Sequence, residues 1–195
     1  AMKRRLFVAA LLSAGLAGCA PSGPTFHSVD ITGADYGKGF ALTDHTGAAR
    51  TLADYKGKVV TLFFGFTHCP AVCPTSLATM KQALALLGQD AARVQVLFVT
   101  LDPERDSTEL LAAYVPKFDA SFVGLRGDAA ATAAVAKEYK IFYQKVPGST
   151  PDSYTLDHSA GTYVHDAQGH LRLFIRHGET PQKIADDLKV LLAQG

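Results

Sequence analysis

Cysteine, net charge and long apolar runs are all scarce in this chain of 195 residues. Three cysteines are too few for a disulfide scaffold in a chain of this length. The formal net charge of +1 at pH 7 gives no basic surface for nucleic acid, so we expect no nucleic-acid partner. The hydrophobic content of 48% and the charged content of 19% are typical of a globular chain that buries a core.

The N-terminal apolar run, Leu6 to Leu16, is about half of the roughly 20 residues that a helix needs to span a bilayer. It follows the basic triplet Lys3-Arg4-Arg5, which is the order found in secretory signals. The next residues, Leu16-Ala17-Gly18-Cys19, resemble the bacterial lipoprotein cleavage box. Residues 1–19 are therefore predicted to hold a lipoprotein signal that is removed before Cys19, which becomes lipidated. The alternative is an ordinary signal peptide in which the cysteine is incidental.

Composition and periodicity divide the remaining chain into a tether and one folded domain. Residues 20–27, which are rich in proline, glycine and serine, are predicted to be a flexible tether, and residues 28–195 a single domain. Apolar runs predict buried strands, and apolar residues spaced three and four apart predict helices. The expected strands are 59–66, 94–101 and 121–125; the expected helices are 75–87, 107–118 with a disturbance at Pro116, Asp128 to Tyr139, and one that begins at Thr180-Pro181; the expected hairpins are 40–52 and 159–176. The polar stretch 146–157 is predicted to be a long loop.

This alternation of strands and helices predicts an α/β fold with an N-terminal β-hairpin and a central mixed sheet flanked by helices on both faces. Ligands of such sheets bind beyond the carboxyl ends of the parallel strands. Cys69 and Cys73 follow one expected strand, and the run from Asp102 to Asp106 follows the next. Both groups should therefore lie at the same edge of the sheet.

Cys69 and Cys73 are the candidate working site, because lipidation of Cys19 leaves no other cysteine. Cysteines at i and i+4 of one helix have Cβ atoms about 5–6 Å apart, whereas a disulfide needs about 3.5–4.5 Å. Thiolates favour soft ions such as Cu(I), and a helix N-terminus favours the thiolate form. The spacing favours metal binding and leaves disulfide exchange open.

Three motifs of this chain resemble those of the Sco/SenC family of copper chaperones, which have a thioredoxin-like fold. They are Gly65-Phe66-Thr67-His68-Cys69-Pro70-Ala71-Val72-Cys73-Pro74, Asp102-Pro103-Glu104-Arg105-Asp106 and Tyr154-Thr155-Leu156-Asp157-His158-Ser159. The motifs occur in the order and spacing of the family, and the resemblance covers residues 30–195 approximately.

The resemblance implies a metallochaperone, not an enzyme, that delivers copper to the copper-bearing subunit of cytochrome c oxidase. It implies that Cys69, Cys73 and His158 hold copper, preferably as Cu(I) with Cu(II) as a second form, and that the cysteines also form a redox disulfide. Another periplasmic copper chaperone or a thiol reductase is a further implied partner. We expect a lipid-anchored protein of the bacterial cell envelope that faces the periplasm. The family role implies the inner membrane, although Ala20 stands where Asp favours retention there.

Several neighbouring residues are candidates for supporting roles. A neutral imidazole would complete a three-ligand Cu(I) site, and of the seven histidines His68 is the second candidate after His158. Asp157 is expected either to orient the His158 ring as a hydrogen-bond acceptor or to be a turn residue. Asp102 and Asp106 are expected to form either a turn and a helix cap or an acidic rim that guides copper donors and partners. Tyr154 is expected to line the pocket.

The main alternative function is a periplasmic thiol–disulfide oxidoreductase that acts on oxidase cysteines. Thioredoxin-like reductases usually carry CxxC and a cis-proline before the facing strand, whereas this pair is CxxxC and His158 stands near that position. A peroxiredoxin would need a Pro-x-x-x-Thr-x-x-Cys motif, which is absent. A copper or redox sensor is a third interpretation, which the sequence does not separate from delivery.

Overall fold

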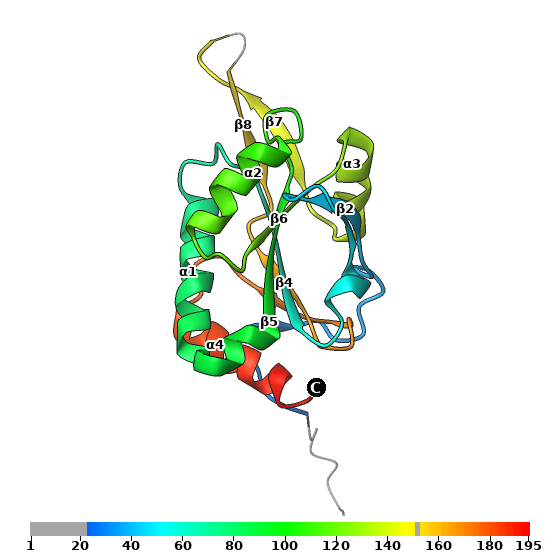
Figure 1. Ribbon diagram of the computed structural model, residues 1–195, viewed down its shortest axis with the longest axis vertical. Helices are drawn as coiled ribbons and strands as arrows, with labels where there is room; N and C mark the ends of the chain where they lie inside the picture. Colours follow the sequence, from blue (N-terminus) through cyan, green and yellow to red (C-terminus); the bar gives the residue numbers. More distant parts are fainter. Residues whose placement is uncertain (1–22, 151–152) are drawn as a thin grey trace, which may run out of the picture.

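The computed structural model describes residues 23–150 and 153–195, which form an eight-stranded sheet, a separate two-stranded sheet and four α-helices (Figure 1). The strands are β1 (Val29–Asp30), β2 (Ala41–Asp44), β3 (Ala49–Thr51), β4 (Val59–Gly65), β5 (Val94–Thr100), β6 (Val123–Arg126), β7 (Tyr143–Pro147), β8 (Tyr154–His158), β9 (Thr162–His165) and β10 (Leu171–Ile175). The helices are α1 (Val72–Leu87), α2 (Thr108–Tyr114), α3 (Ala129–Glu138) and α4 (Pro181–Leu192). None of the helices in this described part has the length and apolarity needed to cross a membrane.

The large sheet has the order β1-β10-β9-β4-β5-β6-β2-β3, and its centre is the parallel set β4, β5 and β6. Every residue of β4 and β5 is buried, as the continuous apolar runs predict for strands covered on both faces. The flanking strands pair antiparallel, so the predicted mixed sheet is confirmed. Because Gly65 lies opposite Thr100, β4 and β5 end at the same edge. The two motifs that follow these strands therefore begin side by side.

Helices cover both faces of this sheet. Figure 1 shows α1 and α4 on one side of the central strands and α3 on the other. Successive side chains of a strand point to opposite faces. Gly65 accordingly faces Cys73 of α1, while Phe64 packs against Tyr139, the residue that follows α3. Gly65, the last residue of β4, therefore lies against the N-terminal turn of α1.

The predicted helix signals are found where the sequence places them. Asp128 accepts a hydrogen bond from the Ala131 N–H, and Thr180 accepts one from the Lys183 N–H ahead of Pro181. Helix α2 ends at Tyr114 and continues as a 3₁₀ turn that contains Pro116. Local capping chemistry and proline therefore account for these ends.

The start of α1 was predicted at Thr75, but the helix begins at Val72. Pro74, in the first turn of the helix, is compatible with this earlier start, although proline interrupts helix interiors. In the first turn its missing N–H costs nothing, since that group has no intrahelical partner there. The helix therefore includes Cys73, whose side chain joins the buried stripe of α1.

The long loop predicted at 146–157 is wrong in its extent, because Val146 and Pro147 belong to strand β7 and the residues from Tyr154 to Asp157 belong to strand β8. Strands β7 and β8 pair antiparallel from Tyr143 opposite His158 to Pro147 opposite Tyr154. The hairpin was missed because β7 is largely exposed and lacks an apolar alternation. His158 consequently ends β8 and does not begin the following strand, which starts at Thr162.

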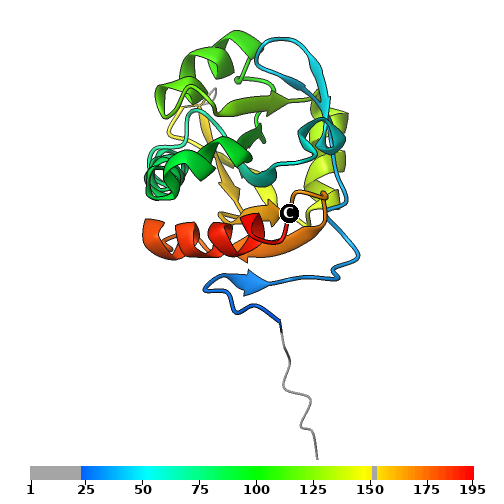
Figure 2. The same cartoon turned by 60° about the horizontal axis from the view of Figure 1, so that its bottom comes forward.

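The N-terminal part of the described chain is fixed to the far edge of the sheet. The backbone N–H groups of His27 and Ser28 donate to the Asp187 carboxylate at 2.7 and 2.8 Å, and β1 then pairs with β10 (Figure 2). Asp187 is only 1% exposed. Phe26 also packs against the core, so the described chain is anchored from Phe26 onward, whereas Cys19 and Ala20 lie outside the described residues.

Candidate metal centre

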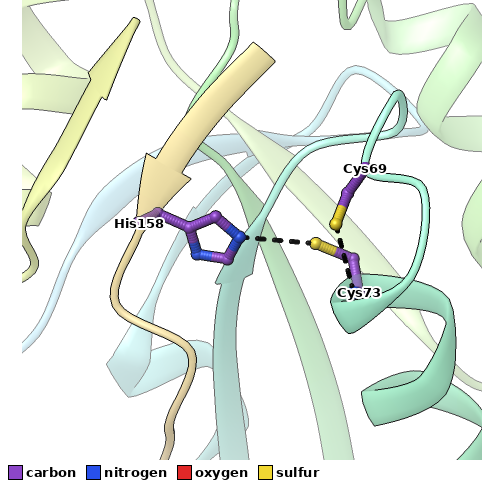
Figure 3. A group of neighbouring side chains, drawn as sticks. All are labelled: Cys69, Cys73 and His158. Atoms are coloured by element: carbon purple, nitrogen blue, oxygen red, sulfur yellow. Dashed lines mark hydrogen bonds between the residues drawn. The ribbon is translucent and has the colours of Figure 1, made fainter. Parts of the chain in front are cut away.

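Cys69, Cys73 and His158 come together from two parts of the chain: the segment that leads into α1 and the end of β8. Their ligand atoms all lie within 4.8 Å of one another, and they form the one cluster of three or more potential metal ligands found in residues 23–150 and 153–195. The Cys73 Sγ lies 3.7 Å from the His158 Nε2 (Figure 3). Figure 3 also shows Cys69 above Cys73, in the chain that leads into α1. The three side chains predicted to hold the metal are therefore neighbours.

Cys69 lies in the turn before α1, so the pair is not held at helical i, i+4 spacing as the sequence argument assumed. The Cys69 Sγ accepts a hydrogen bond from the Cys73 N–H at 3.3 Å. That N–H is one of the free donors of the first helical turn. Both cysteines are free thiols, with Cys69 partly exposed and Cys73 buried. Because Cys69 is outside the helix, bringing the two sulfur atoms together does not require distortion of α1.

Burial dominates the acidity of Cys73. Desolvation raises the pKa of its thiol far above the ordinary value, and the adjacent Cys69 adds to the rise. The expectation that the helix N-terminus would favour a thiolate is therefore wrong for Cys73. In the metal-free protein Cys73 carries its proton at neutral pH. A metal ion must displace that proton in order to bind.

Gly65 is a site residue that the sequence analysis missed. A Cβ at this position would lie 2.7 Å from the Cys73 Sγ, 2.9 Å from Phe63 and 3.0 Å from Phe98. Only glycine leaves room for the sulfur against the end of β4. A glycine within an otherwise continuous apolar strand is a signal for such a close approach, and it could have been used.

The His158 ring is held with its Nε2 towards the cysteines. Its Nδ1 lies 2.9 Å from the Ser159 carbonyl oxygen, which can only accept, so Nδ1 carries the proton and Nε2 a lone pair. The ring packs edge-on against Phe66 at 5.7 Å and Phe63 at 6.3 Å between centroids. Burial lowers the pKa of His158, which keeps the imidazole neutral at pH 7. The buried Cys73 thiol can then donate to Nε2, at the place a metal ion would take.

The carboxylate expected to orient His158 does not do so. Asp157 is exposed on β8, and the alternation of the strand turns its side chain away from that of His158. The Ser159 backbone carbonyl takes the orienting role. The other expectation for Asp157, a turn residue, is also wrong because Asp157 lies within a strand.

His68 lies outside the cluster. Its side chain is 51% exposed, and its Nδ1 lies 3.1 Å from the Thr67 hydroxyl. The adjacent Cys69, by contrast, has its sulfur at the Cys73 N–H. Of the two candidate histidines, the structure brings only His158 to the cysteines.

Asp102 and Asp106 do not form an acidic rim, because they are only 2% and 0% exposed. Asp106 accepts from the Thr67 N–H at 2.9 Å, from the Thr67 hydroxyl and from the Thr100 hydroxyl. It does not cap α2, since Ser107 accepts the bond from the Leu110 N–H. The Asp106 carboxyl instead ties the turn before Cys69 to the end of β5.

Asp102 and Tyr154 bond to each other beside the site. The Tyr154 hydroxyl donates to the Asp102 Oδ1 at 2.7 Å, and burial together with this bond raises the pKa of Tyr154 to about 12. Arg105 donates from its Nε to the Asp102 Oδ2 and stacks on the Tyr154 ring. Asp102 does lie in the predicted turn, where its carbonyl accepts from the N–H groups of Arg105 and Asp106. Tyr154 thus contacts the loop after β5, and the cysteines are not among its hydrogen-bond partners.

The donor set suits a soft metal ion. Two sulfur atoms and one neutral imidazole nitrogen favour Cu(I) over hard cations, which prefer carboxylates, carbonyls and water. The carboxyl group of Asp106, which bonds to the turn before Cys69, is already occupied by the threonine donors. The residues therefore fit a copper ion, and three ligands would leave it open to an incoming fourth.

Comparison with known proteins gives consistent similarities. A family model described as SCO1/SenC matches residues 29–193. The chain is 34% identical over 199 residues to the bovine "Protein SCO2 homolog, mitochondrial", covering 96% of this chain and 75% of the bovine protein. Its structure resembles that of Bradyrhizobium japonicum ScoI with copper bound, with a TM-score of 0.71, 42% identity, and coverage of 77% of this chain and 96% of the other. It also resembles a SCO1/SenC family lipoprotein from Bacillus anthracis, with a TM-score of 0.67, 26% identity, and coverage of 78% and 92%.

Proposed function

The chain belongs to the SCO1/SenC family, and on this premise we propose that it is a copper metallochaperone serving cytochrome c oxidase. Its ligands are Cys69, Cys73 and His158, and its cargo is copper, carried as Cu(I) with Cu(II) as a second form. The observation that carries the proposal is the convergence of two sulfur atoms and one imidazole nitrogen within 4.8 Å. The similarity to ScoI with copper bound supports copper as the metal.

Transfer follows from the coordination that these ligands allow. Binding of Cu(I) displaces the thiol protons, and the neutral His158 Nε2 supplies the third donor. A three-coordinate ion accepts a ligand from the copper-bearing subunit of the oxidase and then leaves as the donors exchange one by one. Cys69 is partly exposed and Cys73 is buried, so the exchange begins on the Cys69 side.

His158→Ala is expected to weaken Cu(I) binding by about 10-fold or more, since loss of a ligand should cost at least as much as loss of an outer partner. His68→Ala is the matched control, because it removes a histidine next to Cys69 that lies outside the cluster. Titration against a calibrated Cu(I) chelator measures both variants at one equivalent per chain. Equal affinity of wild type and His158→Ala would overturn the three-ligand site.

The same comparison has a defined pH dependence. Imidazole binds copper only when unprotonated, and burial lowers the pKa of His158 below its ordinary 6.5. The advantage of wild type over His158→Ala should thus be complete at pH 7 and should decline only as the pH falls through the lowered pKa, below about 6.5. Proton competition at the cysteines affects both proteins alike and cancels in the ratio.

The thiol–disulfide oxidoreductase is the second candidate, and the cysteine pair in a thioredoxin-like fold is what favours it. The attacking group in disulfide exchange is a thiolate. The partly exposed Cys69 would be the attacking group, and burial raises the pKa of the Cys73 thiol that must resolve the mixed disulfide, so only weak reductase activity is expected. Insulin reduction by a protein without copper affinity would favour the oxidoreductase over the chaperone.

We further propose that Cys19 is lipidated after removal of the signal and that residues 20–27 tether the domain at 28–195 to the periplasmic face of the inner membrane. The lipobox-like run that ends at Cys19 supports this, as does the similarity to the lipoprotein from Bacillus anthracis. Two or three acyl chains at about 0.8 kcal/mol per buried CH₂ would anchor the domain stably. Mass spectrometry of the membrane-extracted chain should find acylated Cys19 as the first residue. An unmodified Cys19 within a longer mature chain would refute the anchor.

A further inference from the structure

The strand that carries His158 stands apart from the main sheet. Strands β7 and β8 pair only with each other and project beyond the eight-stranded sheet at one end of the molecule (Figure 1). A two-stranded ribbon is marginally stable by itself in water. The position of His158 relative to the cysteines therefore depends on contacts between this hairpin and the rest of the domain.

Among these contacts is a closed set of three side chains, which we call the clasp: Asp102, Arg105 and Tyr154. The guanidinium of Arg105 donates to the Asp102 carboxylate and, at 2.8 Å, to the Tyr154 carbonyl, and its Cζ lies 3.6 Å from the centroid of the Tyr154 ring. The Tyr154 hydroxyl completes the set by donating to Asp102 at 2.7 Å. Two of the residues belong to the loop after β5 and the third begins β8, so the clasp joins the hairpin to the core of the domain.

The clasp is connected to the third ligand in two ways. Tyr154 and His158 lie four residues apart on one strand, so their side chains share a face of β8. Arg105 also lies over the Phe66 ring, at 6.0 Å from its centroid, and Phe66 packs against the His158 imidazole. Movement of Arg105 or Tyr154 therefore changes both the strand and the aromatic wall that hold His158.

We propose that Arg105 is a positioning residue that, through the clasp, holds His158 against the cysteine pair and so sets the rate at which copper leaves. The part of this proposal that concerns copper release rests on the proposed function. When the clasp opens, the hairpin withdraws the third ligand, and two sulfur atoms alone retain the ion.

The chemistry of the clasp suits a contact that opens. Arginine stays charged and presents a planar fork that bonds and stacks at once, which lysine cannot reproduce. Arg105 Nη2 is nevertheless buried and has no hydrogen-bond partner among the described residues. A buried donor without an acceptor lowers the stability of the closed state. The clasp therefore favours one position of the hairpin, but it is not so stable that the hairpin cannot leave that position.

Arg105→Lys and Tyr154→Phe test the proposal, and Arg172→Lys is the matched control. Arg172 also bonds to a buried aspartate, Asp166, and to a hydroxyl, that of Thr32, but on a different part of the sheet. Release of Cu(I) to excess chelator is expected to be about 10-fold faster in Arg105→Lys, within the range typical of lost outer partners of a metal ligand. The rate for Arg172→Lys should equal that of wild type. An unchanged release rate in both clasp variants would overturn the proposal.

Two further arms show whether Arg105 acts through His158. In the His158→Ala background, Arg105→Lys should accelerate release no further, whereas an equal acceleration there would overturn a positioning role. In the metal-free Arg105→Lys variant, nuclear magnetic resonance should show that the His158 ring protons have lost the ring-current shifts that Phe63 and Phe66 impose in metal-free wild type. Unchanged shifts would also overturn the proposal. This last measurement needs no copper, so it tests the clasp independently of copper binding. A chain that bound no copper would refute the proposed function but not the positioning role of the clasp.

Discussion

Cys73→Ser is expected to abolish tight Cu(I) binding, with a loss well beyond the about 100-fold upper range for outer partners of a metal ligand. Cys73 is buried at the centre of the cluster, where its sulfur lies 3.7 Å from His158 and its N–H contacts Cys69. The serine hydroxyl is a hard, protonated oxygen that Cu(I) does not favour. Cys69→Ser should have the same effect, because one sulfur and one imidazole do not complete the site.

Met80→Leu is the matched control for these variants, since it removes the other sulfur of the α1 stripe. Met80 is 4% exposed within the core, and leucine conserves its volume. Chelator competition should find one tight equivalent of Cu(I) in Met80→Leu and none in Cys73→Ser. A tight equivalent retained by Cys73→Ser would place the copper site elsewhere.

The same variants test delivery in cells. A strain without the gene is expected to lose oxidase activity and to recover part of it when copper is added. Wild type and Met80→Leu should restore activity, and Cys73→Ser should not. Restoration by Cys73→Ser, or a loss that added copper leaves unchanged, would contradict delivery of copper by this cluster.

Gly65→Ala is expected to destabilise the domain by about 1–3 kcal/mol, the usual cost of overpacking a core. The new methyl group would meet the Cys73 sulfur at 2.7 Å, so the sulfur must move and Cu(I) affinity should fall by about 100-fold, the upper range for disturbed support of a ligand. Urea unfolding and chelator competition measure the two effects separately.

Gly124→Ala on β6 is the matched control for Gly65→Ala. A Cβ at Gly124 would meet Val115 at 3.1 Å and Leu111 at 3.2 Å, so some stability is lost, but the cysteines are not involved. Its copper affinity should equal that of wild type. If both glycine variants lost copper affinity alike, the loss would reflect general destabilisation and not displacement of Cys73.

The centre of the fold was predictable because its determinants are local. The apolar runs of β4 and β5 and the cap residues Asp128 and Thr180 act within a few positions of the elements they define. Cys69 and Cys73 stood out by their scarcity and spacing, whereas His158 followed from motif resemblance, since no periodicity points to it. The structure then supplied the distances that make them neighbours.

The errors concern residues whose partners lie far along the chain. The hairpin at β7 and β8 is fastened by Arg105, which is 49 residues before Tyr154. Asp106 is buried because Thr67, 39 residues earlier, satisfies it, whereas aspartate is usually exposed. The partner of the His158 ring is a backbone carbonyl, which every residue possesses and no side-chain pattern reveals. Such contacts depend on the finished fold.

If Cys19 is lipidated as proposed, the hydrogen bonds from His27 and Ser28 to Asp187 limit the distance of the domain from the membrane surface. Eight peptide steps separate Cys19 from His27, and a fully extended chain of that length reaches at most about 28 Å. Figure 1 places the first described residues and α4 at one end of the long axis, opposite the start of α1 and the hairpin. With so short a connection, the end of the domain that holds Cys69, Cys73 and His158 would point away from the bilayer. An acceptor should then present its own copper site well above the membrane surface.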